Sequence, residues 1–289
     1  MRRLASLLFA ALLAAPVLAA PLAANANKHP AGYVPPPREG DWRTPDPQNV
    51  LVIDTTKGRI IVEMTPQAAP LTVTRVRELA RSGFYDGRAF FRVIDNFMDQ
   101  TGDPLDTGTG GSTKPDLPAE FTFRRGPQTP LVVIDKSDGV ERGFIGALPV
   151  ISQSMDLAAL TNDQKVSAYG TFCPGVAGMA RAESPDSGNS QFFLMRGAQT
   201  NLDHNYTAWG RAISGLDVIV AIKTGEPVAP PQDRMTRVRV LADIPAAEQP
   251  HVRVIDPAGP WFRDEVGRVR AEKAIGFSLC DLDLPADIP

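Results

Sequence analysis

The amino-acid sequence predicts a mainly β fold, an antiparallel barrel with helices covering its ends. Many short segments of strand length alternate with polar loops, and only two helical patterns lie among them. The 289 residues are 43% hydrophobic and 22% charged, which is ordinary for a globular protein. A chain of this length forms one sizeable domain with additions, or two small domains.

The first 26 residues have the composition of a secretory signal peptide. Two arginines open the chain, an apolar run follows, and Ala24-Asn25-Ala26 places small residues on either side of one variable position. We expect cleavage after Ala26 and an exported, periplasmic protein without stable membrane insertion. The alternative is an uncleaved membrane anchor, but Pro16 and Pro21 interrupt the run before it reaches the ~20 apolar residues that a span needs.

Two segments flank the expected main domain, which covers residues 48–245. Residues 27–47 are rich in proline and polar residues, which is typical of an extended linker or of a segment laid along the surface. Residues 246–289 form a C-terminal extension, in which PWFRDEVGRVRAEKAIG predicts a helix from Pro260 to Gly276. Its apolar side, which packs on the main domain or binds a partner, would contain Phe262, Val266, Val269 and Ala274.

The main domain begins with a hairpin. NVLVIDTTKGRIIVEM contains two alternating β segments around Thr56-Lys57-Gly58. Apolar residues then recur at helical spacing, which predicts a helix capped by Thr72 or Thr74 and ended by Gly83. AFFRVI, at residues 89–94, predicts the next strand.

The second half of the domain is less regular at its start. Between residues 124 and 172, LVVID and FIGALPVI predict short strands, and SMDLAALTNDQKVSAYG predicts a short helix and turns. VAGMAR, SQFFLMR and YTAWGRAI are further strand candidates. SGLDVIVAIKTG predicts a helix that ends at Gly225, and TRVRVLADI predicts a closing strand.

Charge and composition exclude some kinds of site. The formal net charge is −3 with both signs interspersed, so no basic surface for nucleic acid is expected. The three histidines are scattered without metal-ligand spacing, and neither a metal nor another cofactor is predicted. Cys173 and Cys280 either pair as a disulfide, which an oxidising compartment permits, or stay as two separate buried thiols.

Two segments place polar side chains among aromatic residues. FFRVIDNFMDQTGDP surrounds Arg92 and Gln100 with apolar side chains, and GMARAESPDSGNSQFFLMRG does the same for Gln191. Strand alternation places Met98 with Gln100 on one face, and Gln191 with Phe193 on one face. Single polar residues in strands usually face solvent. Two such segments instead indicate a ligand from outside, because an unpaired buried polar group costs ~1–3 kcal/mol.

A proline ring with its flanking peptide groups fits such a site. Rotation about an X-Pro bond is opposed by amide resonance, with a barrier of ~18–20 kcal/mol, and needs neither a nucleophile nor a metal to be accelerated. The site must hold the ring, exclude water and donate a hydrogen bond to the twisted amide. An arginine suits this task because it does not lose its proton.

Both segments resemble the cyclophilin-type peptidyl-prolyl cis-trans isomerases. FFRVIDNFMDQTGDP is similar to that family's F-H-R-V-I-x-x-F-M-x-Q-G-G-D stretch, and GMARAESPDSGNSQFFLM to its segment ending in S-Q-F-F. The similarity extends from about residue 50 to about residue 244. It implies an eight-stranded antiparallel barrel capped by two helices, and an isomerase whose partners are proline-containing segments of folding exported proteins. Residues 124–170 are then an insertion that shapes substrate choice, binds a partner or simply elaborates the fold.

The resemblance also implies roles for single residues. Arg92 would be the catalytic arginine, and Gln100 would orient it and the substrate carbonyl. The pocket for the proline ring would be formed by Phe97, Met98, Phe193 and Leu202. The other groove residues would be Ala180, Arg181 with its backbone holding the residue before proline, Gln191 and Tyr206.

Departures from the family pattern leave one rival function. Asn201 stands where eukaryotic members have tryptophan, which disfavours cyclosporin binding more than catalysis. The rival is a chaperone or peptide-binding module with the same fold and weak or no isomerase activity. A hydrolase is excluded, because no serine lies in a nucleophile elbow and histidines are too few.

Overall fold

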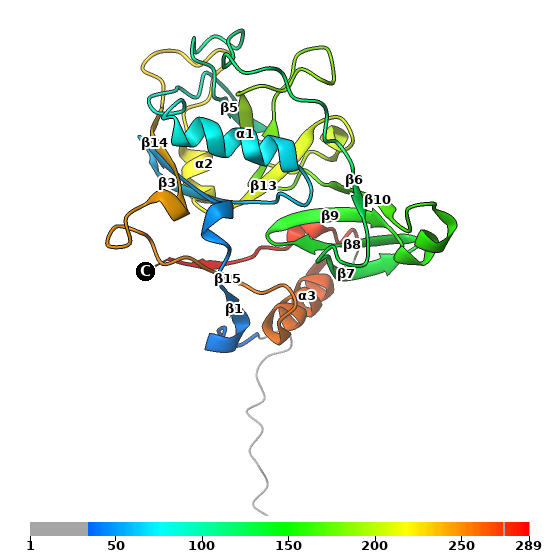
Figure 1. The fold of residues 1–289 in the computed structure, drawn as a ribbon. Helices are drawn as coiled ribbons and strands as arrows, with labels where there is room; N and C mark the ends of the chain where they lie inside the picture. Colours follow the sequence, from blue (N-terminus) through cyan, green and yellow to red (C-terminus); the bar gives the residue numbers. More distant parts are fainter. Residues whose placement is uncertain (1–33, 274, 289) are drawn as a thin grey trace, which may run out of the picture. The chain divides into compact units, whose positions relative to one another are not determined.

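The computed structural model describes residues 34–273 and 275–288 (Figure 1). The expected signal peptide, the first part of the expected linker and Ala274 lie outside the described residues. Within the described part of the chain, no helix combines the length and the apolar character that crossing a membrane requires.

Eight antiparallel strands form a curved sheet in the order β14-β2-β3-β13-β11-β12-β5-β4. Backbone hydrogen bonds between Val93 and Gly225, and from Phe90 to Asp233, connect the segments beside the two sheet edges. The predicted mainly β, eight-stranded architecture is confirmed. The strand bounds are β2 Val50–Thr55, β3 Gly58–Met64, β4 Arg92–Ile94, β5 Met98–Thr101, β11 Val176–Met179, β12 Phe192–Met195, β13 Thr207–Ser214 and β14 Met235–Val240.

Helix α1, Pro70–Arg81, covers one side of this sheet (Figure 1). The predicted threonine cap was wrong: Pro70 occupies the first turn, where its missing N–H costs nothing. The free N–H groups of Leu71 and Thr72 donate instead to the two carboxylate oxygens of Glu120, at 2.9 and 2.8 Å. The predicted end is correct, since Gly83 adopts φ +69° just beyond the helix.

Helix α2, Leu216–Ala221, is shorter than the sequence pattern predicts. Ile222 is already extended and 2% exposed, so its burial in the core overrides its helical preference. The Arg196 guanidinium accounts for the early end, because it donates to the carbonyl oxygens of Ile219, Val220 and Ile222. These are carbonyls that a helix end leaves without partners.

The barrel strand β2 is buried on both faces. Leu51 and Ile53 belong to the core inside the barrel, whereas Val50 and Val52 belong to a second cluster outside it. The alternation expected for this segment is therefore absent, because added elements cover the outer face. We call these elements, the two smaller sheets with helix α3, the outer region.

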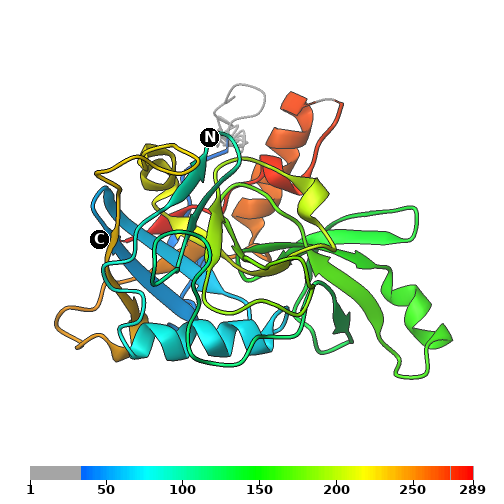
Figure 2. The same cartoon turned by 90° about the horizontal axis from the view of Figure 1, so that it is seen from above.

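The larger sheet of the outer region has five antiparallel strands in the order β6-β10-β9-β8-β7. FIGALPVI forms two strands joined by a turn rather than one strand, and the end of SMDLAALTNDQKVSAYG forms a strand rather than a turn. The sheet lies beside the barrel in Figure 2. Its strands are β6 Phe123–Arg125, β7 Val132–Ser137, β8 Val140–Ile145, β9 Leu148–Gln153 and β10 Val166–Gly170.

The smaller sheet joins the two ends of the described chain. It pairs β1, Trp42–Arg43, with β15, Arg253–Ile255, and β15 with β16, Ala286–Asp287. The described part of the proline-rich segment thus lies along the surface. Arg43 also donates two hydrogen bonds of 2.7 Å to Glu63 of the barrel. Short 3-10 helices occupy Glu39–Asp41, Pro47–Asn49, Met155–Leu160, Thr200–Leu202, Leu241–Asp243 and Leu279–Asp281.

Helix α3, Pro260–Lys273, packs on the five-stranded sheet (Figures 1 and 2). The rings of Phe262 and Phe144 meet edge to face at 5.6 Å, and Arg270 pairs with Asp135. Of the two alternatives for this helix, the structure has the one in which it packs on the same chain. A disulfide between Cys173 and Cys280, with Cα atoms 4.8 Å apart, joins the C-terminal segment to the loop before β11.

Candidate functional site

Three of the predicted site residues form a row with Gly178 across four neighbouring strands. Arg92 of β4 lies opposite Gln100 of β5, which lies opposite Phe193 of β12, which in turn faces Gly178 of β11. Residues directly opposite one another share a face of the sheet. That face is the outer one, because Phe192 is in the interior cluster and Phe193 in an outer cluster.

A pocket of about 120 Å³ opens on this outer face. Its volume suits one small ring rather than a drug-sized ligand, which typically needs ~300–1,000 Å³. Nine of the ten predicted groove residues line it together, and the tenth, Gln191, lines the adjoining pocket. The lining residues are Arg92, Phe97, Met98, Gln100, Ala180, Arg181, Phe193, Leu202 and Tyr206.

The back of the pocket depends on one glycine and one aromatic ring. A Cβ atom at Gly178 would lie 2.3 Å from the Phe193 ring, so a larger residue would displace that ring. The ring of Phe172 stacks behind Phe193 with centroids 5.8 Å apart, and Tyr206 contacts Phe193 edge to face at 5.7 Å. Phe193 is therefore fixed from two sides.

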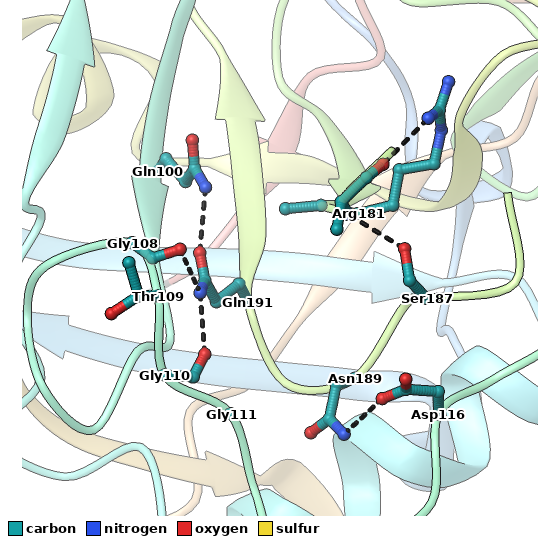
Figure 3. Close-up of a pocket in the computed structure, with 12 residues that line it drawn as sticks. Gln100, Gly108, Thr109, Gly110, Gly111, Asp116, Arg181, Ser187, Asn189 and Gln191 are labelled. Carbon is teal, nitrogen blue, oxygen red and sulfur yellow. Dashed lines mark hydrogen bonds between the residues drawn. The ribbon is translucent and has the colours of Figure 1, made fainter. Parts of the chain in front are cut away.

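The polar side of the pocket is a chain of side-chain hydrogen bonds. Arg92 Nη1 donates to Gln100 Oε1 at 3.3 Å, and Gln100 Nε2 donates to Gln191 Oε1 at 2.9 Å. Gln191 Nε2 then donates to the carbonyl oxygens of Gly110 and Gly108 (Figure 3). Each amide is oriented by its neighbour, so the chain fixes the Gln100 oxygen toward the guanidinium.

A buried carboxylate holds the loop that ends this chain. Asp103 accepts backbone hydrogen bonds from Leu105, Thr107 and Gly108. Burial alone would raise the pKa of Asp103, but hydrogen bonds from backbone N–H groups outweigh it and lower the pKa. The ionised carboxylate thus keeps the glycine carbonyls in place for Gln191.

A second, more polar pocket of about 310 Å³ adjoins the first (Figure 3). Gln100, Ala180 and Arg181 line both pockets. On the far side, Asn189 donates to Asp116 at 2.8 Å. A peptide whose proline occupies the first pocket would have its neighbouring residues near these groups.

The side chain of Arg181 connects two loops of the groove. It lies over the Tyr206 ring at 4.7 Å and donates to the Asn205 carbonyl at 2.9 Å. Asn201 is exposed and lines neither pocket, and His204 contacts Tyr169 of the outer region with ring centroids 3.8 Å apart. The proposed backbone role of Arg181 stays a prediction.

Sequence reasoning missed three residues of this site. Gly178 is the first residue of the GMARAESPDSGNSQFFLMRG motif, and Phe172 lies shortly before it. Their position at this motif was the only signal for them. Glu226 had no such signal. It follows α2 in a loop, and its Oε1 lies 2.5 Å from Arg92 Nε across 134 residues of sequence.

Comparisons with known proteins agree with this geometry. The family described as "Cyclophilin type peptidyl-prolyl cis-trans isomerase/CLD" matches residues 50–241. A probable peptidyl-prolyl cis-trans isomerase of Brucella suis biovar 1 (strain 1330) is 32% identical over 191 residues, covering 62% of this chain and 74% of that protein. Peptidyl-prolyl cis-trans isomerase CYP71 of Arabidopsis thaliana is 31% identical over 190 residues, covering 65% of this chain and 23% of that protein.

The crystal structure of cyclophilin AquaCyp293 from Hirschia baltica is similar over a larger share of the chain. It has a TM-score of 0.79 and 34% sequence identity, and the match covers 86% of this chain and 93% of that one. That share exceeds what residues 50–241 span, so the similarity extends into the outer region. The sequence relatives are named as isomerases, in agreement with the predicted enzyme class. The chain therefore belongs to the cyclophilin-type peptidyl-prolyl cis-trans isomerases.

Proposed function

We propose that this isomerase accelerates cis-trans exchange at X-Pro bonds of exported proteins in a bacterial envelope, with Arg92 as its catalytic donor. The observation that carries the proposal is the position of Arg92. Its guanidinium lines the same small pocket as Phe97, Met98 and Phe193. A proline ring held by these apolar side chains would place its amide nitrogen beside a permanent hydrogen-bond donor.

The chemistry needs only binding and electrostatics. When the X-Pro amide twists, its nitrogen loses conjugation and becomes able to accept a hydrogen bond, which the planar amide does not do. A hydrogen bond donated by Arg92 would be stronger in the twisted state than in either planar isomer. It would therefore lower the barrier to rotation about the X-Pro bond. Leu202 and Met98, both nearly fully buried, would exclude water from the ring.

The remaining groove residues would orient the substrate. Gln100 would hold the guanidinium and the substrate carbonyl, and Gln191 would hold Gln100 through the hydrogen-bond chain. Ala180, the Arg181 backbone and Tyr206 would line the path of the peptide. None of these roles involves a covalent intermediate, which matches a reaction in which no covalent bond is made or broken.

Two features support the exported location. The first 26 residues have the pattern of a signal peptide. The disulfide between Cys173 and Cys280 is a bond that persists in oxidising compartments such as the periplasm and is rare in the cytosol.

The catalytic assignment is tested by peptide isomerisation with wild type, Arg92→Ala and Arg92→Lys. Removing one preorganised donor is expected to lower kcat/KM about 10²- to 10³-fold, with Lys recovering little because it lacks the planar fork. The control is Arg268→Ala, which removes a half-buried arginine of α3 that lines neither pocket. Wild-type rates in Arg92→Ala would overturn the assignment, and negligible rates in wild type itself would favour the peptide-binding module.

The location is tested by expressing the full chain in a Gram-negative host. We expect release by osmotic shock and a mass corresponding to a start at Asn27. A chain that keeps Met1 and stays in the cytoplasm or with the membrane would contradict export.

A further inference from the structure

A glutamate outside both pockets contacts the proposed catalytic arginine. Glu226 Oε1 accepts a hydrogen bond from Arg92 Nε at 2.5 Å, and the two side chains are 56% and 36% exposed. An exposed ion pair of this kind contributes little to folding stability, typically ~0–1 kcal/mol. Its position on the reactive guanidinium therefore matters more for the chemistry of the groove than for the fold.

The backbone fixes where this glutamate can reach. Gly225 exchanges two hydrogen bonds of 2.8 Å with Val93, and the Val228 N–H donates to the Phe91 carbonyl at 2.9 Å. The two neighbours of Arg92 in sequence are thus bonded to residues on either side of Glu226. The loop is held beside β4 at two points, so the backbone of Glu226 stays within reach of Arg92.

The guanidinium is consequently clamped on two of its three nitrogens. Nε donates to Glu226 and Nη1 donates to Gln100. Among the described residues, no hydrogen bond involves Nη2. A planar group fixed at Nε and at Nη1 cannot rotate about its Cδ–Nε bond without losing both partners. Both N–H groups of Nη2 and the second N–H of Nη1 are left to donate to substrate.

We propose that Glu226 is a positioning residue that holds the Arg92 guanidinium for catalysis and cancels its charge toward the substrate. The proposal rests on the catalytic role proposed for Arg92. With the carboxylate present, the pair carries no net charge, so acidic and basic residues flanking proline meet little discrimination. Without it, Arg92 is both less fixed and a bare cation at the mouth of the pocket.

The test is a kinetic comparison of Glu226→Gln and Glu226→Ala with wild type, using tetrapeptides with Glu, Ala or Lys before proline. Glu226→Gln keeps an acceptor but loses its charge, and we expect kcat/KM to fall about fivefold, with a larger fall in Glu226→Ala. The loss should appear in kcat more than in KM, because the proposed contact orients a transition-state donor. Circular dichroism melting should be unchanged.

The preference between acidic and basic peptides is a second measurement, and it would not change if Glu226 had only a structural role. In Glu226→Gln, the ratio of kcat/KM for the Glu peptide over the Lys peptide should rise about threefold at low salt, as expected for one removed charge at a partly exposed site. In 1 M salt the rise should vanish, since screening then acts within ~3 Å. The matched control is Glu272→Gln, which removes an exposed glutamate paired with Arg268 on α3.

A double-mutant cycle shows whether Glu226 acts through Arg92. The variant Arg92→Ala with Glu226→Gln should be no slower than Arg92→Ala alone. If the double variant lost the product of the two single losses in kcat/KM, the inference would be overturned. It would also be overturned if Glu226→Gln kept the wild-type rate and charge preference while Arg92→Ala was slow. If Arg92→Ala itself kept wild-type rates, the catalytic role proposed for Arg92 would fail. This result can be told apart from the two results that would overturn the role of Glu226.

Discussion

The groove and the outer region hold their charged side chains in different ways. In the groove, the Arg92–Glu226 pair is 36% and 56% exposed. In the five-stranded sheet, the Arg125–Glu141 pair is 7% and 6% exposed, at 2.5 Å. An exposed pair is worth little to the fold, whereas a buried pair is costly to break. From this difference we infer that the Arg92–Glu226 pair serves the proposed reaction, while the Arg125–Glu141 pair serves the stability of the five-stranded sheet.

The two regions meet in a single apolar cluster. Met98 and Phe193 of the pocket pack in the same cluster as Leu148 and Val150 of the five-stranded sheet, with Phe172 between them. The outer region is thus the rear support of the pocket, although it contributes no polar group to the hydrogen-bond chain. Substitutions in the groove should therefore change activity, and substitutions in the outer region should change stability. Only substitutions in this shared cluster should change both.

The largest effect on stability is expected from the disulfide. Replacing Cys173 and Cys280 by Ser removes a cross-link over 107 residues, which the chain-entropy model values at up to ~4.7 kcal/mol. Guanidinium unfolding measures the loss, and reduction of the wild type provides the same comparison without mutation. An unchanged unfolding midpoint would show that the link between the C-terminal segment and the loop before β11 adds nothing to stability.

Glu141→Ala breaks the buried pair and is expected to cost about 3–5 kcal/mol, because Arg125 is left buried without its partner. Glu226→Ala should cost no more than ~1 kcal/mol, with both variants measured by urea unfolding. Isomerase activity of the folded protein should show the reverse order, with Glu141→Ala close to wild type. Equal stability losses in the two variants would remove the distinction between the regions.

Acid pH should weaken the outer region more mildly. Burial opposes ionisation of Glu141, but hydrogen bonds from Arg125 and Lys136 outweigh it and lower the pKa of Glu141. A lowered pKa in the folded state gives stability that is present above the ordinary glutamate pKa of about 4.3 and is lost as pH falls through the folded value. Melting temperatures of wild type and Glu141→Gln should therefore converge as the pH falls below the ordinary glutamate pKa of about 4.3. A constant gap would show that Glu141 does not titrate as described.

The smallest effect is expected from a substitution in the cluster that the groove and the outer region share. Phe172→Leu keeps an apolar side chain but loosens the support behind Phe193, and we expect a stability loss below ~1.5 kcal/mol. Here activity should change as well, with KM rising about twofold because the proline ring meets a less fixed wall. If KM stayed constant, the pocket would not depend on its rear support.

The barrel and most of the groove could be predicted from the sequence, because both depend on local signals. The hairpin, the end of α1 and the strand faces of Phe192 and Phe193 follow from turn chemistry and alternation. Eight of the ten groove residues lie in two continuous motifs, and the other two, Leu202 and Tyr206, lie in the segment that follows the second motif. The structure brings them together, although their individual roles stay predictions.

What the sequence could not predict depends on contacts between distant segments. Glu120 caps α1 from 48 residues away. Arg196, which follows β12, ends α2 by donating to carbonyl oxygens at the end of that helix. For the five-stranded sheet, the sequence predicted only a few short strands, although β7, β8 and β9 each pair with the next strand along the chain. Only the pairing of β6 with β10 joins distant segments. Glu226 has no motif of its own, and the backbone bonds of Gly225 with Val93 and of Val228 with Phe91 place it beside Arg92.

The most direct test of the central claim is a crystal structure of the protein with the peptide Ala-Ala-Pro-Ala. We predict that the proline ring occupies the pocket between Phe97, Met98 and Phe193, with the Arg92 guanidinium within hydrogen-bond distance of the prolyl amide. A ring bound elsewhere on the surface, or a guanidinium turned away from the bound amide, would contradict the claim.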